Sequence, residues 1–207
     1  MMWRTFDRDL ASATVVAVLA GWMLAGCGDD ATDGSDTDTD AGTTPQVVEV
    51  EGTIVDSFAC EACGGGCTRD SLDYPSRSHL DATINYVDPP PAGGDHNRCW
   101  ARWGVYDEPL SPIHWVHNME HGGIVVLYDC TDCDAEIAEL TSWVASLGDT
   151  AILTPFEGLP TPFAVVSWGE RMLMDCVDVD AMRDFYDQNF DNAPESTLSG
   201  PPSGCMD

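Results

Sequence analysis

The sequence predicts an α+β domain in which helices pack on a mostly antiparallel sheet and disulfides brace a single domain. Three observations predict this class. Short apolar segments of strand length alternate with longer segments whose apolar residues recur at helical spacing. Two of the short segments flank Gly169-Glu170, a two-residue turn typical of an antiparallel hairpin. Cysteine is abundant, with nine in 207 residues.

The first predicted strands lie before residue 87. β-branched residues between Val48 and Val55 indicate an extended segment, and residues 82–86 indicate a second short strand. The segment CEACGGGC between them is too rich in glycine and cysteine for regular structure, so we expect a disulfide-held loop. Prolines and glycines over residues 89–96 predict a rigid loop that presents His96.

A short helix is predicted over residues 112–121. Ser111-Pro112 resembles an N-cap followed by proline at the first helical position, and Gly122 resembles the glycine just past a helix end. The apolar run IVVLY then predicts a buried strand within residues 123–129.

The C-terminal half continues this alternation. Apolar residues at helical spacing over residues 135–147, with Gly148 as the stop, predict an amphipathic helix. Predicted strands follow at residues 151–155, 163–168 and 171–175. A final amphipathic helix extends from Val179 to Phe190, with Asp178 as a candidate cap.

The N-terminus resembles the export signal of a bacterial lipoprotein. Arg4 and Arg8 precede an apolar stretch over residues 10–24, which ends in Leu24-Ala25-Gly26-Cys27. We therefore expect a lipoprotein signal peptide over residues 1–26 and a lipid on Cys27. The alternatives are an ordinary signal peptide and an uncleaved anchor. The prediction is an exported bacterial lipoprotein, anchored to the membrane and facing the periplasm or the cell exterior.

Composition divides the rest of the chain. Residues 27–45 comprise the lipidated cysteine and an acidic tether without enough apolar side chains to build a core. Residues 46–207 have the length of one globular domain. The net charge of −28 makes nucleic acid a poor partner, and the chain has no Walker loop or dinucleotide fingerprint that would indicate a nucleotide. The expected partners are the membrane, through the lipid, and an envelope protein.

Eight cysteines remain once Cys27 is set aside, and export favours disulfides among them. These are Cys60, Cys63, Cys67, Cys99, Cys130, Cys133, Cys176 and Cys205. Their pairing stays open. The two Cys-x-x-Cys pairs could also form a zinc ribbon or redox pairs, but neither shows the sequence setting of a thioredoxin-like helix start, although Cys133 precedes a helix.

A histidine-rich segment carries the candidate chemistry. His114, His117 and His121 share one face of the predicted helix, with Glu120 beside them. Neutral imidazole suits zinc, copper, nickel or iron, and His96 could add a ligand from its loop. Histidines that only cap and pack the helix end are the alternative.

Two further patterns bear on the metal hypothesis. Three methionines, Met119, Met172 and Met174, could supply soft ligands for copper, although core packing also explains them. Residues 117–121 match the His-x-x-Glu-His pattern of some zinc proteases. Gly122-Gly123 ends the helix at the second histidine, which argues against such a protease.

The chain resembles the bacterial domain of unknown function 3105 family over about residues 84–195. The resemblance rests on Pro89-Pro90 through His96, Gly104 through Pro109, Val116-His117-Asn118-Met119-Glu120-His121-Gly122-Gly123, Ser167 through Arg171, and Pro194-Glu195. The family implies no activity. It does imply that His96, His117 and His121 stand at motif positions, whereas His79 and His114 do not. Asp95, Met119 and Glu170 depart from the pattern.

These observations favour a domain that binds zinc or copper through His96, His117 and His121, with Glu120 as a fourth ligand or as a partner that orients the ligands. A non-catalytic interaction module of the cell envelope is the alternative. Its contact region would be exposed aromatic residues around Trp100, Trp103 and Tyr106. A metal-dependent hydrolase, with Glu120 as general base, is the third hypothesis.

Overall fold

The structure is a computed structural model that describes residues 46–196. These residues lie within one compact unit, Gly42–Asp207. The predicted signal peptide, the lipid on Cys27, the acidic tether and Cys205 fall outside the described residues, so those predictions stand as they were. No helix in the described part of the chain is long and apolar enough to cross a membrane.

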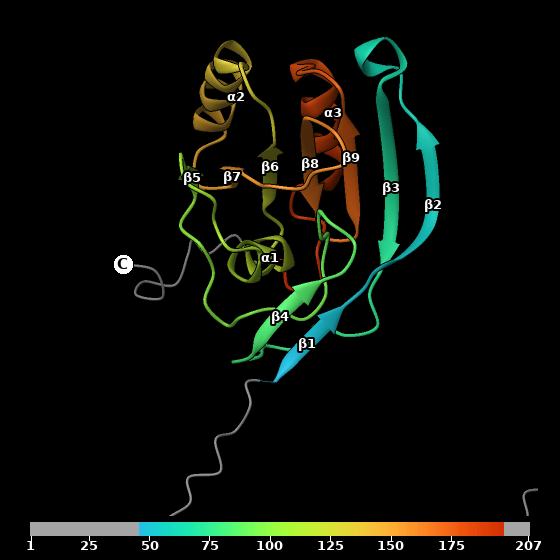
Figure 1. The fold of residues 1–207 in the computed structure, drawn as a ribbon, viewed down its shortest axis with the longest axis vertical. Coiled ribbons are helices and arrows are strands. Elements are labelled where there is room, and N and C mark those ends of the chain that lie inside the picture. The colour runs from blue at the N-terminus through green and yellow to red at the C-terminus, as the bar shows by residue number, and fades with distance from the viewer. Residues whose placement is uncertain (1–45, 197–207) are drawn as a thin grey trace, which may run out of the picture. The chain divides into compact units, whose positions relative to one another are not determined.

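A seven-stranded sheet forms the centre of the domain, in the order β2-β3-β9-β8-β6-β7-β5 (Figure 1). Its strands are β2 (Thr53–Ala59), β3 (Cys67–Asp73), β5 (Gly104–Val105), β6 (Ile124–Tyr128), β7 (Ala151–Pro155), β8 (Phe163–Ser167) and β9 (Glu170–Met174). Neighbouring strands are antiparallel from β2 to β6, whereas β7 is parallel to β6 and to β5. A separate parallel pair joins β1 (Val47–Val50) to β4 (Thr83–Tyr86). The predicted α+β class with a mostly antiparallel sheet is confirmed.

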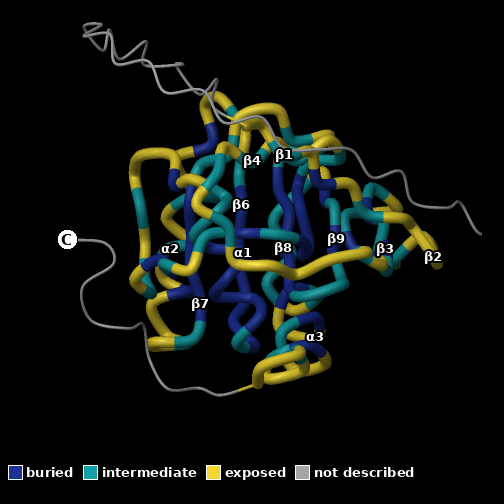
Figure 2. The backbone as a smooth tube through the Cα atoms, turned by 90° about the horizontal axis from the view of Figure 1, so that it is seen from below, coloured by how far each residue is buried: buried dark blue, intermediate teal, exposed yellow. Residues whose placement is uncertain are grey.

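Helices cover both faces of this sheet. Successive side chains of a strand point to opposite faces, so Val126 packs in one core and its neighbour Val125 in the other. The helices α2 (Asp134–Leu147) and α3 (Val179–Asn189) cover the first core, and α1 (Pro112–Glu120) covers the second. Figure 2 shows the buried central strands between more exposed surface segments.

Periodicity predicted the central elements closely. The bounds of α1, α2, α3 and β6 to β9 agree with the prediction within one residue at each end. Asp178 caps α3 as predicted, since its Oδ1 accepts a hydrogen bond from Ala181 N at 3.1 Å. The prediction missed β3 because polar residues interrupt its pattern. Asp70 of β3 is nevertheless buried, and it pairs with Arg171 across to β9.

Three disulfides lie within the described residues: Cys60–Cys67, Cys63–Cys176 and Cys130–Cys133. Cys99 is also disulfide-bonded. The predicted disulfide-held loop at residues 60–67 is confirmed, and it contains a short 3-10 helix, η1 (Ala62–Gly65). The second bridge ties this loop to the chain that follows β9.

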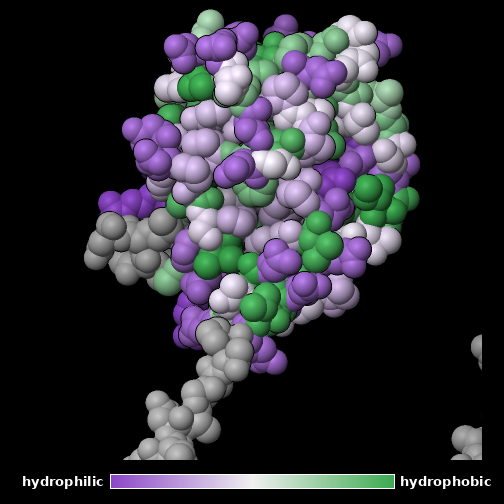
Figure 3. Space-filling model, viewed as in Figure 1, coloured by the Kyte–Doolittle hydropathy of each residue, from purple (hydrophilic) through white to green (hydrophobic). Residues whose placement is uncertain are grey.

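The outer strand β2 is exposed along its whole length. Its apolar residues Ile54, Val55 and Phe58 are about half exposed, and Figure 3 shows apolar side chains over this edge. A register shift between Ile54 and Asp56 interrupts its pairing with β3. An irregular edge strand that carries a charge is a poor template for pairing with another chain.

Candidate metal centre

The end of α1 is held directly against the start of β6. Gly122 adopts a φ of +92°, which L side chains rarely adopt, and its N–H donates to Met119 O at 2.9 Å. A Cβ on Gly123 would overlap the ring of Trp103. These two glycines let the chain turn at once from the helix into the central strand, so the last turn of α1 has a fixed position. His117 and Glu120 lie on that turn.

Two tyrosine hydroxyls anchor the backbone of the proline-rich loop just before His96. The Tyr74 hydroxyl accepts a hydrogen bond from Ala92 N at 2.8 Å, and the Tyr86 hydroxyl donates to Asp95 O at 2.9 Å. The Pro89-Pro90 peptide bond is cis. His96 is therefore delivered to the end of α1 by a restrained loop, and its side chain is fully buried.

His79 reaches the same place through a backbone pairing that the sequence did not reveal. His96 N donates to Ser78 O at 3.0 Å, and Leu80 N donates to His96 O at 2.8 Å. This isolated bridge sets His79 beside His96, with ring centroids 4.8 Å apart.

Four side chains converge at the end of α1. The candidate ligand atoms of His79, His96, His117 and Glu120 lie within 4.8 Å of one another, so this group can hold a metal ion. His96, His117 and Glu120 are buried, whereas the side chain of His79 is 40% exposed. We call these four residues the histidine cluster. Glu120 also belongs to a second group, with His121 and Glu195, that meets the same distance limit.

The tautomers of three histidines follow from their backbone partners. His96 Nδ1 lies 2.8 Å from Gly94 O, His117 Nδ1 lies 2.9 Å from Asn97 O, and His121 Nδ1 lies 3.0 Å from Glu195 O. A carbonyl oxygen only accepts, so each Nδ1 carries the proton and the neutral ring has its lone pair on Nε2. Histidines that bind metals typically donate their other ring N–H to a carbonyl in this way.

The Nε2 atoms then face other acceptors. His117 Nε2 lies 3.0 Å from His121 Nε2, and His96 Nε2 lies 3.1 Å from Glu120 Oε2. Two lone pairs at such distances require either an extra proton or a cation between them. Two nitrogens bound to one tetrahedral zinc at ordinary bond lengths would be roughly 3.3 Å apart. The spacing therefore suits a metal.

Local electrostatics also favour a cation. Burial alone would raise the pKa of Glu120. Without a metal, a proton on Nε2 of His96 and of His79 takes the place of the cation, and the resulting hydrogen bonds and positive charge outweigh burial and lower the pKa of Glu120 to about 2. Arg77 Nη1 adds a contact with Glu120 Oε1 at 3.2 Å. Burial is the main cause that lowers the pKa of His117 to about 4, and the neighbouring histidines act in the same direction. At neutral pH the cluster thus contains a buried carboxylate and a neutral imidazole ligand.

The metal-free protein should lose stability as the pH falls from about 6.5 to about 4. The unfolded chain binds a proton at His117 in this window, whereas the folded protein resists it because the folded pKa is lower. Urea unfolding at pH 7.5 and pH 5 measures the difference. The decrease should become smaller in His117→Gln but not in His114→Gln. An equal decrease in both variants would show that His117 is not responsible.

The segment after α3 completes the surroundings of the histidine cluster. Glu195 N donates to Glu120 O at 3.0 Å, and Asp191 N donates to Gly122 O at 2.9 Å. Glu195 Oε1 also lies 3.5 Å from Arg77 Nη1. The Pro194-Glu195 block of the family pattern therefore lies against the last turn of α1.

The four predicted metal ligands divide between the two groups. His96, His117 and Glu120 belong to the histidine cluster, whereas His121 belongs to the neighbouring group. His79 does not stand at a motif position of the family pattern, and its place in the histidine cluster follows from its backbone pairing with His96. His114 belongs to neither group among the described residues, and its Nδ1 lies 2.6 Å from Cys99 O.

Trp100 and the methionine residues considered from the sequence are packed in the structure instead of being available to a partner or a metal. The expected aromatic surface differs from the prediction, because Trp100 is only 8% exposed and stacks on His121 with ring centroids 4.3 Å apart. The methionines considered for copper, Met119, Met172 and Met174, are buried in the two cores. Core packing therefore accounts for all three.

A family described as "Protein of unknown function (DUF3105)" matches residues 78–200. The chain belongs to this family. All five histidines fall within the matched region of this DUF3105 chain, His79 included. No curated protein and no solved structure showed significant similarity to it.

Proposed function

We propose that this DUF3105 domain binds one transition-metal ion through His79, His96, His117 and Glu120. The observation that carries the proposal is the convergence of three imidazoles on a buried carboxylate, with Nδ1 of His96 and His117 directed at carbonyl oxygens. This arrangement leaves Nε2 available to a cation.

Zinc is the favoured ion and copper the alternative. Three imidazole nitrogens and one carboxylate oxygen are ligands that both zinc and oxidised copper accept. The methionine thioethers that would favour reduced copper lie in the cores instead. His121 stays a candidate ligand from the neighbouring group, since its Nε2 is 3.0 Å from His117 Nε2.

Binding is better supported than catalysis. Four protein ligands fill a tetrahedral zinc site, whereas catalytic zinc sites keep one position for water or substrate. Glu120 Oε2 lies 3.1 Å from both His96 Nε2 and His79 Nε2, and Arg77 contacts Oε1, so the carboxylate is better placed to hold a cation beside these nitrogens than to act as a general base. The interaction-module hypothesis loses one of its proposed contacts because Trp100 is buried.

Metal content tests the proposal directly. Purified, oxidised protein should contain about one zinc or copper ion per chain by elemental analysis. After chelation, titration calorimetry with zinc, copper(II) and calcium should show binding of a transition metal and not of calcium, because calcium prefers oxygen ligands. Chelated, folded protein that takes up neither zinc nor copper would refute the proposal.

We further propose that the domain is exported and held at the membrane by a lipid on Cys27. The lipobox-like Leu24-Ala25-Gly26-Cys27 and the disulfides of the domain support this location. The Cys27→Ser variant should lose the lipid and leave the membrane fraction. Detergent phase partition of both proteins after expression in a bacterium measures this. Equal partition into the detergent phase would contradict a lipid on Cys27.

A further inference from the structure

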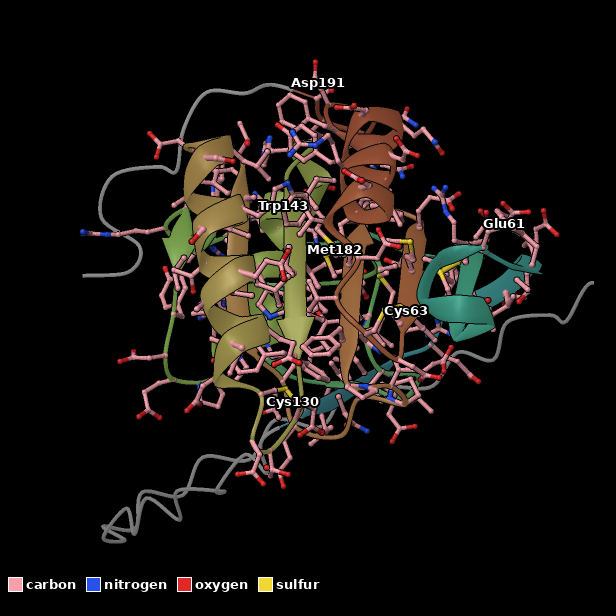
Figure 4. All side chains as sticks on the ribbon, turned by 90° about the horizontal axis from the view of Figure 1, so that it is seen from above. Glu61, Cys63, Cys130, Trp143, Met182 and Asp191 are labelled. Carbon is pink, nitrogen blue, oxygen red and sulfur yellow. A yellow bond between two sulfur atoms is a disulfide. The ribbon has the colours of Figure 1, made fainter. Side chains whose placement is uncertain are left out.

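A disulfide lies at the opposite end of β6 from the histidine cluster. Cys130, labelled in Figure 4, follows the end of β6 by two residues. Cys133 is the N-cap residue of α2. The strand β7, parallel to β6, follows α2. A Cys-x-x-Cys pair in such a βαβ unit is typical of thioredoxin-like redox motifs. The structure thus supplies the strand and helix setting that the sequence did not show for this pair.

The rest of the sheet agrees with this setting. The antiparallel strands β8 and β9 continue the sheet from β6, and α3 follows β9. Strand order β7-β6-β8-β9, with α2 after β6 and α3 after β9, corresponds to a thioredoxin-like core, except that residues 156–162 between β7 and β8 contain no helix. This relation is one of topology, so the chemistry has to be argued from the cysteines themselves.

The two cysteine residues differ in exposure. Cys130 is partly exposed, whereas Cys133 is 7% exposed and packs in the core beneath α2. The loop before β8 runs beside Cys130, since Asp129 N donates to Pro162 O at 2.9 Å. A thiolate from solvent can therefore approach Cys130 more easily than Cys133.

The N-terminus of α2 suits Cys133 as the leaving sulfur. The first N–H groups of a helix lack intrahelical partners, and their partial positive charge lowers the pKa of a nearby thiol. The side chain of Cys133 makes no capping hydrogen bond in the disulfide form. Reduction would give the helix a thiolate to stabilise.

The bridge is a weak structural brace. Its cysteines are three residues apart, whereas the Cys63–Cys176 bridge spans 113 residues. A disulfide that closes a short loop restrains the unfolded chain far less than one that closes a long loop. Stability therefore gives little reason for a bridge at this position.

We propose that Cys130–Cys133 is a redox-active disulfide that oxidises cysteine pairs in other exported proteins or peptides. A partner thiolate attacks Cys130 Sγ, a partner–Cys130 disulfide forms, and the Cys130–Cys133 bond breaks with Cys133 leaving as a thiolate. The partner's second thiolate then attacks the partner's own sulfur and releases Cys130. The partner loses two electrons and two protons, and the two cysteines become thiols. Exchange with a second disulfide compound reverses these steps and regenerates the bridge.

The surface charge selects among partners. Asp129, Asp132 and Asp134 surround the two cysteines in the sequence, within a chain of net charge −28. Cationic thiols are therefore attracted and anionic thiols repelled, an effect that salt screens. The expected substrate is a basic peptide or protein segment that carries two reduced cysteines.

Limited reduction of the full oxidised chain tests the proposal. Alkylation and peptide mass spectrometry after treatment with cysteamine should show Cys130–Cys133 opening at least about tenfold faster than Cys60–Cys67 or Cys63–Cys176. Thioglycolate, compared with cysteamine at equal thiolate concentration, should open the bridge more slowly, and added salt should reduce the difference between the two rates. Equal opening of all three bridges would overturn the proposal.

Trapping tests the order of attack. The probe is a basic single-cysteine peptide supplied as its disulfide-linked dimer. The Cys130 thiolate of Cys133→Ser should attack this dimer, release one peptide as a thiol and keep the other as a mixed disulfide, because Cys133 is absent and cannot displace it. The matched control, Cys67→Ser, leaves Cys60 unpaired and should trap less peptide. Equal trapping by both variants would contradict the assigned roles. If Cys133→Ser does not fold, the relative rates at which the disulfides of the unmodified chain are reduced test the proposal instead.

Discussion

Zinc will raise the melting temperature of the wild-type protein by roughly 5–10 °C more than that of His96→Ala. At a zinc concentration 1,000 times the Kd, binding contributes about 4 kcal/mol to the free energy of unfolding. Loss of a buried ligand should weaken binding at least about 100-fold, since even outer partners of ligands cost 10 to 100-fold. The contribution at the same zinc concentration then falls to roughly 1.4 kcal/mol. The lost stabilisation corresponds to several degrees for a domain of this size.

The control for this experiment lies on the same helix. His114 is also a histidine of α1 whose Nδ1 lies near a backbone carbonyl, but it does not belong to the histidine cluster. His114→Ala should keep the full zinc-induced increase in melting temperature. Each increase is measured against the same variant without metal, which removes the cost of the cavity that the substitution leaves. Equal increases in His96→Ala and His114→Ala would refute zinc binding by the cluster.

Two further variants distinguish the neighbouring groups. His79→Ala should lose zinc stabilisation as His96→Ala does, whereas His121→Ala should keep most of it. The reverse result would place the ion in the group formed by Glu120, His121 and Glu195. The comparison is informative because both residues lie close to His117 but belong to different groups.

Asp70→Ala will destabilise the protein by about 3 kcal/mol or more in urea unfolding, because it leaves a buried arginine without its main partner. Arg171 Nε lies 2.8 Å from Asp70 Oδ2, and both side chains are nearly inaccessible to solvent. Asp88 lies 3.4 Å from Arg171 Nη1 and compensates only in part. Since this pair joins β3 to β9, the substitution should also loosen the chain that leaves β3 toward His79.

A surface ion pair provides the matched comparison. Arg98 and Asp81 are 3.0 Å apart, but their side chains are 64% and 70% exposed. Asp81→Ala should therefore cost less than about 1 kcal/mol. The double variant Asp70→Leu with Arg171→Met should recover much of the stability lost in Asp70→Ala, because no unpaired charge remains. Similar losses in Asp70→Ala and Asp81→Ala would contradict a structural role for the buried pair.

Local pattern was sufficient for the elements around the centre of the sheet. The apolar run of β6 and the helical spacing in α2 depend on neighbours in the sequence, and the structure agrees with both. The predicted hairpin between β8 and β9 is present, but its turn residues are Trp168-Gly169 instead of Gly169-Glu170, so glycine is second in the turn. Strand β3 was not predicted because it depends on a residue far away in the sequence. Its buried Asp70 is acceptable only because Arg171 lies opposite on β9, about one hundred residues later in the chain.

The candidate site likewise contains residues that local sequence pattern indicated and residues that it could not indicate. The sequence alone indicated His96, His117 and Glu120, because a proline-rich loop and a short glycine-terminated helix present them in a recognisable pattern. It could not indicate His79, whose position depends on a backbone bridge to His96, or Glu195, whose segment docks on α1 from the other end of the chain.

The sequence by itself determined the α+β class, the central elements and the residue types available for metal binding, since these follow from periodicity and composition. Only the tertiary structure decided which histidines share one position, which tautomers they adopt and where the Cys130–Cys133 pair lies in the sheet. Those properties depend on contacts between residues far apart in the chain, and local spacing carries no information about such contacts.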